Sequence, residues 1–177
     1  KLTMTPPKKH PDNPLIPIGK KGACDAGGVQ FYGSMIEHEG KYKLWYVALD
    51  DTVFKRAYQG LRVAYAESDD GIHWTKPNLG LVEYRGNTNN NLVAFDPPEA
   101  CTIHMIVLHE ADEPDPTRRF KMMMNVQTRL AARKKNVATS VAFFSADGLR
   151  WRAATKMEFE NGQIKDEYRT LPPVHFE

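Results

Sequence analysis

Cysteine is scarce in this sequence. Cys24 and Cys101 are the only two cysteines among its 177 residues, and they have neither Cys-x-x-Cys spacing nor a paired histidine, so we expect no zinc site. No Asp-x-Asp-x-Asp-Gly loop is present, so we expect no calcium site either. We predict no metal and no cofactor. For the two thiols, two interpretations stay open: unpaired side chains, or a disulfide between neighbouring units if the protein is exported.

The sequence also lacks a charge excess and a long apolar run. Lys and Arg number 24 against 22 Asp and Glu, and the basic stretch 129–135, read as a solvated loop with at most one helical turn, lacks interleaved aromatics. We expect no nucleic acid partner. No window of about 18 consecutive apolar residues exists, so we expect no transmembrane helix and no membrane partner. The chain has no signal peptide and begins with Lys1, which suggests a processed or truncated protein.

Two similar stretches organise the sequence. Residues 68–74 and 145–151 both read Ser-x-Asp-Gly-x-x-Trp, 77 positions apart. Asp-Gly between two β-rich runs is a strong hairpin signal, because glycine accepts the positive φ that such turns need. We expect each Asp to accept hydrogen bonds from backbone NH groups inside its turn, and each Trp to pack back over the turn.

The similarity extends upstream of both turns. Residues 41–47 and 119–125 share the order basic, aromatic, Lys, apolar, and an apolar strand ending in Glu precedes each, at 31–39 and 102–110. Each unit therefore reads as strand, turn, strand, loop, strand, Asp-Gly turn, and a strand ending at Trp. Antiparallel sheets of four strands repeated at such a period are typical of β-propeller blades. The alternative is two independent hairpins in a β-sandwich.

The predicted fold is all-β, one β-propeller-like domain over residues 1–177. We place the first blade at about 25–84, the second at about 92–158, and the start of a third unit at about 166–177. Closed propellers need about four to eight blades. We therefore expect a partial propeller, in which the remaining blades are missing from this chain or self-association completes the ring.

Three stretches carry a resemblance to a known group of proteins. They are Lys-Tyr-Lys-Leu-Trp-Tyr at 41–46, the run from Val63 to Tyr84, and Arg-Arg-Phe-Lys-Met at 118–122. Over about residues 10–160 the chain resembles the five-bladed propeller glycosidases around the invertases and arabinanases. More closely, it is similar to the proteins described as glycoside hydrolase family 32 N-terminal-like, and it is also family 43-like. The resemblance implies a carbohydrate partner and a secreted or periplasmic location.

The resemblance also implies a chemistry. These families cleave glycosidic bonds with carboxylates at the propeller axis: an Asp as base or nucleophile, a second Asp that stabilises, and a Glu acid on a later blade. Two carboxyl groups serve an oxocarbenium-like transition state, and their separation sets retention or inversion. The usual Asn-Asp-Pro motif is replaced by residues 24–27, Cys-Asp-Ala-Gly, and the Arg-Asp-Pro and Glu-Cys motifs have no match.

Five residues are candidates for the site. We predict Asp25 and Asp112 as catalytic residues and His104, Tyr32 and Glu110 as substrate-binding residues. Structural roles compete with these. Asp25 could cap a Gly-rich bend, Asp112 and Glu110 could be solvated near a hairpin, and His104 could be a hydrogen-bonded core histidine.

Two functions follow from these observations. The first is hydrolysis of a glycosidic bond by paired carboxylates, in an enzyme of which this chain is a part. The second is a non-catalytic carbohydrate-binding or interaction propeller, which the missing motifs favour. A sialidase-like propeller shares the Asp-containing turn, but it would require three arginines around a carboxylate that the sequence does not single out.

Overall fold

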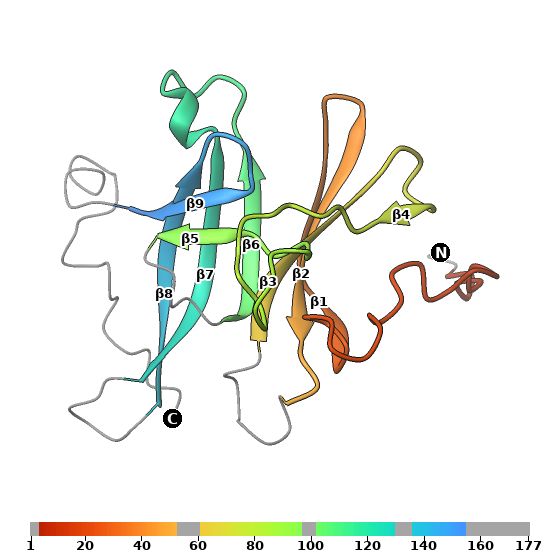
Figure 1. Ribbon diagram of the computed structural model, residues 1–177. Coiled ribbons are helices and arrows are strands. Elements are labelled where there is room, and N and C mark those ends of the chain that lie inside the picture. The colour runs from red at the N-terminus through yellow and green to blue at the C-terminus, as the bar shows by residue number, and fades with distance from the viewer. Residues whose placement is uncertain (1–3, 53–60, 97–101, 130–135, 155–177) are drawn as a thin grey trace.

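The computed structural model describes residues 4–52, 61–96, 102–129 and 136–154. Within these ranges the chain is all-β, as predicted, with one four-stranded sheet, one five-stranded sheet and a short 3-10 helix, η1 (Pro116–Arg118). The two sheets are neighbours in space (Figure 1). Three predictions fall outside the described residues: the third unit at 166–177, the state of Cys101, and the helical turn expected after residue 129.

The first sheet is antiparallel, with its strands in chain order. Its members are β1 (Gly28–His38), β2 (Lys41–Leu49), β3 (Leu61–Ser68) and β4 (Trp74–Thr75). The strands expected from the sequence are all present. β2 is buried over most of its length, because both faces of the sheet are covered. This explains why its sequence is a continuous apolar run rather than an alternating one.

The second sheet has one strand more than the sequence predicts. Its strands are β5 (Ala94–Asp96), β9 (Arg150–Ala153), β8 (Asn136–Ser145), β7 (Phe120–Arg129) and β6 (Thr102–His109), in this spatial order. The additional strand is β5, which pairs in parallel with β9. We expected residues 91–95 only to lead into the second unit. Their pairing partner lies more than 50 residues later in the chain, so local pattern gives no sign of it.

Both Asp-Gly turns have the same hydrogen bonds. In the first, Asp70 Oδ1 accepts from the NH groups of residues 72 and 73 at 2.8 and 2.7 Å. In the second, Asp147 Oδ1 accepts from residues 149 and 150 at 2.7 and 2.8 Å. Gly71 and Gly148 have φ of +75° and +77°, as the hairpin interpretation requires.

The tryptophans pack over the turns as expected, but their place in the strands differs. Trp74 Nε1 donates to the carbonyl of Gly71 at 2.9 Å, and Trp151 Nε1 donates to that of Gly148 at 3.0 Å. We expected each Trp to end a strand. Instead Trp74 begins β4 and Trp151 is the second residue of β9. The NH groups just before each Trp are held by the turn Asp, so sheet pairing starts only at or next to the Trp.

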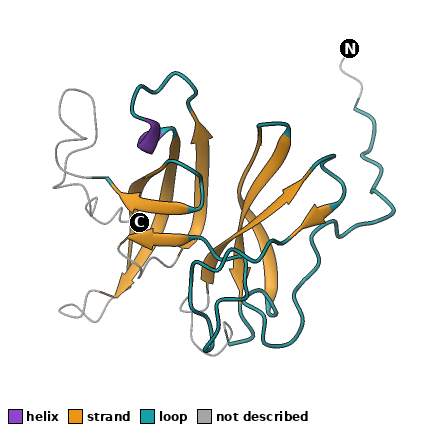
Figure 2. Ribbon diagram, turned by 45° about the horizontal axis from the view of Figure 1, so that its top comes forward, coloured by secondary structure: helices purple, strands orange, loops and turns teal. Residues whose placement is uncertain are grey.

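The main core lies between the two sheets, which face each other in Figure 2. Trp45 of β2 is at its centre, with ring centroids 6.1 Å from Phe120 and 6.4 Å from Trp151. Its Nε1 donates to the carbonyl of Gly148 at 2.7 Å. The Asp-Gly turn of the second sheet is therefore fixed against the first sheet by a buried hydrogen bond.

The edge strands β1 and β6 lie side by side and run in the same direction. Tyr32 contacts His104 near the start of both strands, with ring centroids 4.8 Å apart. His38 contacts His109 at their ends, with ring centroids 4.2 Å apart. The β1–β2 and β6–β7 hairpins therefore lie at the same end of the molecule (Figure 1).

The other face of the first sheet is covered by the chain itself. A second buried cluster there includes Cys24, Leu44, Tyr46 and Leu92. Ile16 and Val82 pack against it. Ile16 belongs to the segment before β1, residues 4–23, which we call the lead-in, and Val82 belongs to the loop after β4. This cover forms the candidate site described next.

Candidate functional site

A polar cavity lies beside the start of β1, between the N-terminal lead-in and the loop after β4. Its volume is about 400 Å³, within the range of about 300–1,000 Å³ typical of small-molecule sites. Asp25, Lys76 and Tyr84 line it, together with five asparagines: Asn78, Asn87, Asn89, Asn90 and Asn91. Among its lining residues in the described part of the chain, Asp25 is the one carboxylate.

Asp25 is buried, and one of its carboxylate oxygens accepts two hydrogen bonds. Its Oδ2 accepts from the hydroxyl of Tyr46 at 2.9 Å and from Nζ of Lys76, with which it forms an ion pair. Lys76 Nζ also donates to the carbonyl of Pro17 at 2.6 Å. A buried carboxylate needs such compensation, because an unpaired charge away from water is very costly. The pair joins the lead-in, the start of β1 and the loop after β4.

A chain of hydrogen bonds continues from Asp25 into the protein. Asn91 Nδ2 donates to the Tyr46 hydroxyl oxygen at 2.8 Å and to the carbonyl of Tyr65 at 2.6 Å. Cys24 Sγ donates to Asn91 Oδ1 at 3.5 Å. Burial, and then the charge of Asp25, raises the pKa of Cys24 to about 11. Cys24 is a free, protonated thiol and not an activated nucleophile.

Two tyrosines of the site stay neutral at physiological pH. Burial, followed by the charge of Asp25, raises the pKa of Tyr46 above its ordinary value. Burial also raises the pKa of Tyr84 to about 12. The Tyr84 hydroxyl is buried and has no hydrogen-bond partner among the described residues. An unsatisfied buried hydroxyl is uncommon in folded proteins.

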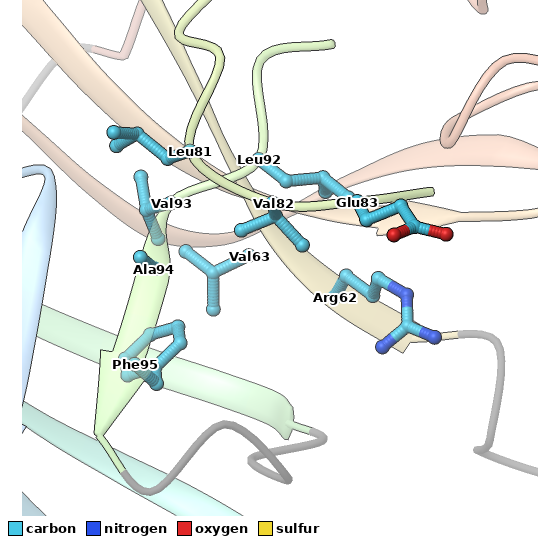
Figure 3. A pocket seen from close by; sticks show the side chains of 9 residues that line it. All are labelled: Arg62, Val63, Leu81, Val82, Glu83, Leu92, Val93, Ala94 and Phe95. Atoms are coloured by element: carbon cyan, nitrogen blue, oxygen red, sulfur yellow. The ribbon is translucent and has the colours of Figure 1, made fainter. Parts of the chain in front are cut away.

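A second cavity of about 400 Å³ has a different character. Figure 3 shows mostly apolar side chains around it, including Val63, Val93 and Phe95, with Arg62 and Glu83 together at one side. Apart from Arg62 and Glu83, the side chains that line this cavity offer no donor or acceptor to a polar ligand. The cavity beside Asp25 is therefore the better candidate for a polyhydroxylated molecule.

Two predicted substrate-binding residues lie on the neighbouring edge strands β1 and β6. Tyr32 and His104 are exposed side chains of β1 and β6, and their rings meet edge to face. The structure brings these two residues together although 72 positions separate them in the sequence. His104 is not a core histidine. Neither residue is among those that line the cavity beside Asp25.

The other two predicted residues lie at the opposite end of β6. Glu110 and Asp112 follow the last residue of this strand, and both are exposed. Glu110 pairs with Lys121, which also pairs with Glu113 at 2.7 Å. The eight residues of β6 span about 26 Å, while Asp25 precedes the start of the neighbouring β1. The structure thus does not bring Asp112 close to Asp25.

Two histidines meet at the same hairpin end. His38 and His109 stack with ring centroids 4.2 Å apart. Burial, and then the positive charges of Lys43 and His109, lowers the pKa of His38. Glu39 lies 3.5 Å from His38 and partly opposes this effect.

Comparisons with known proteins give matches in structure alone. No protein-family model matches the chain, and no curated protein matches it. Eleven chains of solved structures match. The chain is structurally similar to propeller glycosidases of families GH32 and GH43 and to a deacetylase.

Three of these structures illustrate the similarity. An N-acetylgalactosamine deacetylase from F. plautii, in complex with blood group B trisaccharide, is 22% identical over 67% of this chain and 28% of its own, with a TM-score of 0.41. A GH32 beta-fructofuranosidase from Bombyx mori with sucrose is 16% identical over 68% and 21%, with a TM-score of 0.41. A GH43 beta-1,3-galactosidase with galactodeoxynojirimycin is 16% identical over 78% and 37%, with a TM-score of 0.44. The chain thus spans between 21% and 37% of the length of these three proteins.

Sequence reasoning found Asp25 but missed its partners. Lys76 was part of the motif that carried the family resemblance, yet nothing in its local sequence marks it as the counterion of a residue 51 positions earlier. Asn91 likewise ends an Asn-rich stretch, residues 87–91, without any local sign of its buried contacts. Within the residues that the structure describes, no group of three potential metal ligands occurs, and no helix is long and apolar enough to cross a membrane.

Proposed function

We propose that the two sheets are successive blades of a five-bladed β-propeller, and that the chain binds carbohydrate in the cavity beside Asp25. The observation that carries this proposal is a cavity of about 400 Å³ lined by Asp25, Lys76 and five asparagines. The same two hydrogen-bonded Asp-Gly turns in successive sheets support the blade assignment.

The lining of the cavity has the chemistry that sugar hydroxyls need. Each sugar hydroxyl both donates and accepts, and a side-chain amide offers two donors and one acceptor oxygen. Asn78 and Asn89 are bonded to each other at 2.9 Å at its rim, which leaves further donor capacity on each amide. Lys76 carries three donors, of which two are used within the protein. The pair Asp25–Lys76 sets a fixed polar wall that requires no rearrangement to receive a neutral ligand.

Non-catalytic binding explains this cavity better than hydrolysis does. Glycosidases place two carboxyl groups about 5–9.5 Å apart. Asp25 is the one carboxylate that lines the cavity among the described residues, and the predicted second acid, Asp112, lies beyond the far end of β6. Asp25 is also held by Lys76 and Tyr46. Its role is to build the wall of the binding site.

Asn89→Ala tests the binding proposal. Asn89 is an exposed residue that lines the cavity. Sugar affinity, measured by calorimetry on ligands selected from a glycan array, is expected to fall about threefold to tenfold because one hydrogen bond from the side-chain amide is lost. Asp112→Asn is the matched control, a polar change far from the cavity. Unchanged affinity in Asn89→Ala would remove the sugar from this cavity.

Hydrolysis by the full-length protein is the second candidate. Asp25 leads into an innermost strand, the position from which these families supply a carboxylate, and the second acid would come from residues outside the described part. Wild type and Asp25→Asn, both as full-length protein, are assayed against fructans, arabinans and other plant glycans. Activity that disappears in Asp25→Asn while glycan binding persists supports an enzyme. Binding without turnover in the wild type supports the non-catalytic function.

A further inference from the structure

The mostly apolar cavity shown in Figure 3 lies against the start of β3. Its volume is about 400 Å³. It is formed by β3, the loop after β4, and β5 with the two residues before it. Its apolar walls include Val63, Leu81, Val82, Leu92, Val93 and Phe95. A mostly apolar lining with a few placed polar groups is typical of small-molecule sites.

Hydrogen bonds of the main chain hold these walls in place. The NH of Val93 donates to the carbonyl of Val63 at 3.2 Å, and the NH of Ala94 donates to the carbonyl of Leu149 at 2.9 Å. On the opposite wall, the carbonyl of Val82 accepts from Asn90 Nδ2 at 2.8 Å. The cavity is therefore formed before a ligand arrives, which lowers the cost of binding.

Two opposite charges lie together on one side of this cavity, those of Arg62 and Glu83 (Figure 3). Within the described part of the chain, neither side chain forms a hydrogen bond or an ion pair. Elsewhere oppositely charged neighbours do pair, as Arg150 Nη1 does with Asp147 Oδ2 at 2.9 Å. Both charges at the cavity are therefore available to a ligand.

We infer that this cavity binds a free α-amino acid with an apolar side chain. The guanidinium of Arg62 binds its carboxylate, because two parallel NH donors match the two oxygens. The carboxylate of Glu83 accepts from its ammonium group. The apolar side chain lies against the walls around Val63 and Phe95. In an α-amino acid one carbon atom carries both charged groups, so a single small molecule reaches two neighbouring charges of opposite sign.

Other small molecules match the cavity less well. A neutral sugar would bring hydroxyls against apolar walls that offer them no partner. An apolar acid would place a second carboxylate beside Glu83, and an apolar amine would place a second cation beside Arg62. Like charges brought together in a binding site oppose binding. A zwitterion with an apolar body gives each charge an opposite partner.

The first test uses the ligand and two analogues in calorimetry. N-acetyl-L-leucine lacks the ammonium charge and L-leucinamide lacks the carboxylate charge, while the side chain stays the same. L-Leucine is expected to bind at least about tenfold more tightly than either analogue. Analogues that bind as tightly as L-leucine overturn the inference, because the ligand is then an apolar acid or an apolar amine. No binding of L-leucine or L-phenylalanine at about 10 mM also overturns it.

The second test assigns the two charges by variants. Glu83→Gln should remove the preference for L-leucine over N-acetyl-L-leucine, and Arg62→Gln the preference over L-leucinamide. A damaged fold would weaken all ligands alike, so a selective loss reports charge recognition. Glu37→Gln is the matched control, because Glu37 is exposed and lies at the other end of the first sheet. It should change no affinity. An unchanged preference in Glu83→Gln overturns the inference.

This inference goes beyond the proposed function and does not depend on carbohydrate binding. Asn89→Ala, which tests the sugar site, should leave the affinity for L-leucine unchanged. A lower L-leucine affinity in Asn89→Ala would place the amino acid in the cavity beside Asp25 and would overturn the inference. The two proposals therefore fail separately.

Discussion

The ion pair between Asp25 and Lys76 should be the most sensitive polar contact of the described structure. Asp25→Asn keeps the shape of the side chain but removes the negative charge that pairs with the Lys76 ammonium. The side chains are 3% and 23% exposed, so solvent compensates only part of the loss. Breaking a fully buried pair costs about 3–5 kcal/mol. With the partial exposure of Lys76 we expect about 2–4 kcal/mol.

A double-mutant cycle separates the pair from its surroundings. The variants are Asp25→Asn, Lys76→Met and the double variant, measured by urea denaturation monitored by tryptophan fluorescence. The double variant removes both charges, so it should be less destabilised than the sum of the single variants, with a coupling of about 1–3 kcal/mol. The matched control is the exposed ion pair between Asp51 and Arg85, where Asp51→Asn should cost less than about 1 kcal/mol.

The refuting result is additivity. If the two single variants sum to the double, the charges do not interact in the folded protein, and the cavity wall is not built around this pair. A variant Asp25→Asn that is as stable as the wild type would have the same meaning. In either case Asp25 would be available for chemistry, and the case for a purely structural carboxylate would fail.

Three further predictions concern the turns and the histidine pair. Gly148→Ala should destabilise the protein about 1–3 kcal/mol more than Gly71→Ala. Both alanines would be strained at φ of +77° and +75°, but only the Cβ added at position 148 would lie 2.8 Å from the Trp45 ring. Equal denaturation midpoints for the two variants would contradict this packing. In the folded protein the pKa of His38 is below its ordinary value of 6.5. Its contribution to stability is therefore present above pH 6.5 and is lost as the pH falls through the folded pKa. His38→Gln should flatten the fall in unfolding free energy between about pH 7 and 5, and a pH profile identical to that of the wild type would contradict this role of His38. Asp147→Ala should lower the free energy of unfolding by about 1–2 kcal/mol, because two backbone NH groups lose their acceptor. Asp147→Asn keeps an oxygen at this position and should lower it less. Thermal denaturation of the two variants checks this ranking.

The local parts of the fold were predictable from the sequence. The Asp-Gly turns combine a glycine that needs positive φ with an Asp that binds the next NH groups, and each of these effects acts within four residues. The strand expected at 41–47 lies within β2 (Lys41–Leu49). By contrast, the pairing of β5 with β9 depends on residues far apart in the chain, and short-range pattern carries no information about it.

The candidate site was predictable only in part, for the same reason. Asp25 was found because it stands before a strand, but its role depends on Lys76 and Tyr46, which come from other strands and loops. Asp112 was chosen as a second acid because it lies in the second unit. The parallel course of β1 and β6 puts these two residues at opposite ends, because Asp25 precedes its strand and Asp112 follows the other.

The two outer faces of the pair of sheets differ. On the first sheet, Gly19 lets the lead-in approach so closely that a Cβ there would lie 2.2 Å from Asp25 Oδ1. The buried pair of Asp25 with Lys76, which also bonds the carbonyl of Pro17, then fixes this cover in place. On the second sheet, Ile106 and Met123 have no comparable cover among the described residues. The ion pair therefore stabilises the cover of the first sheet as well as the wall of the cavity.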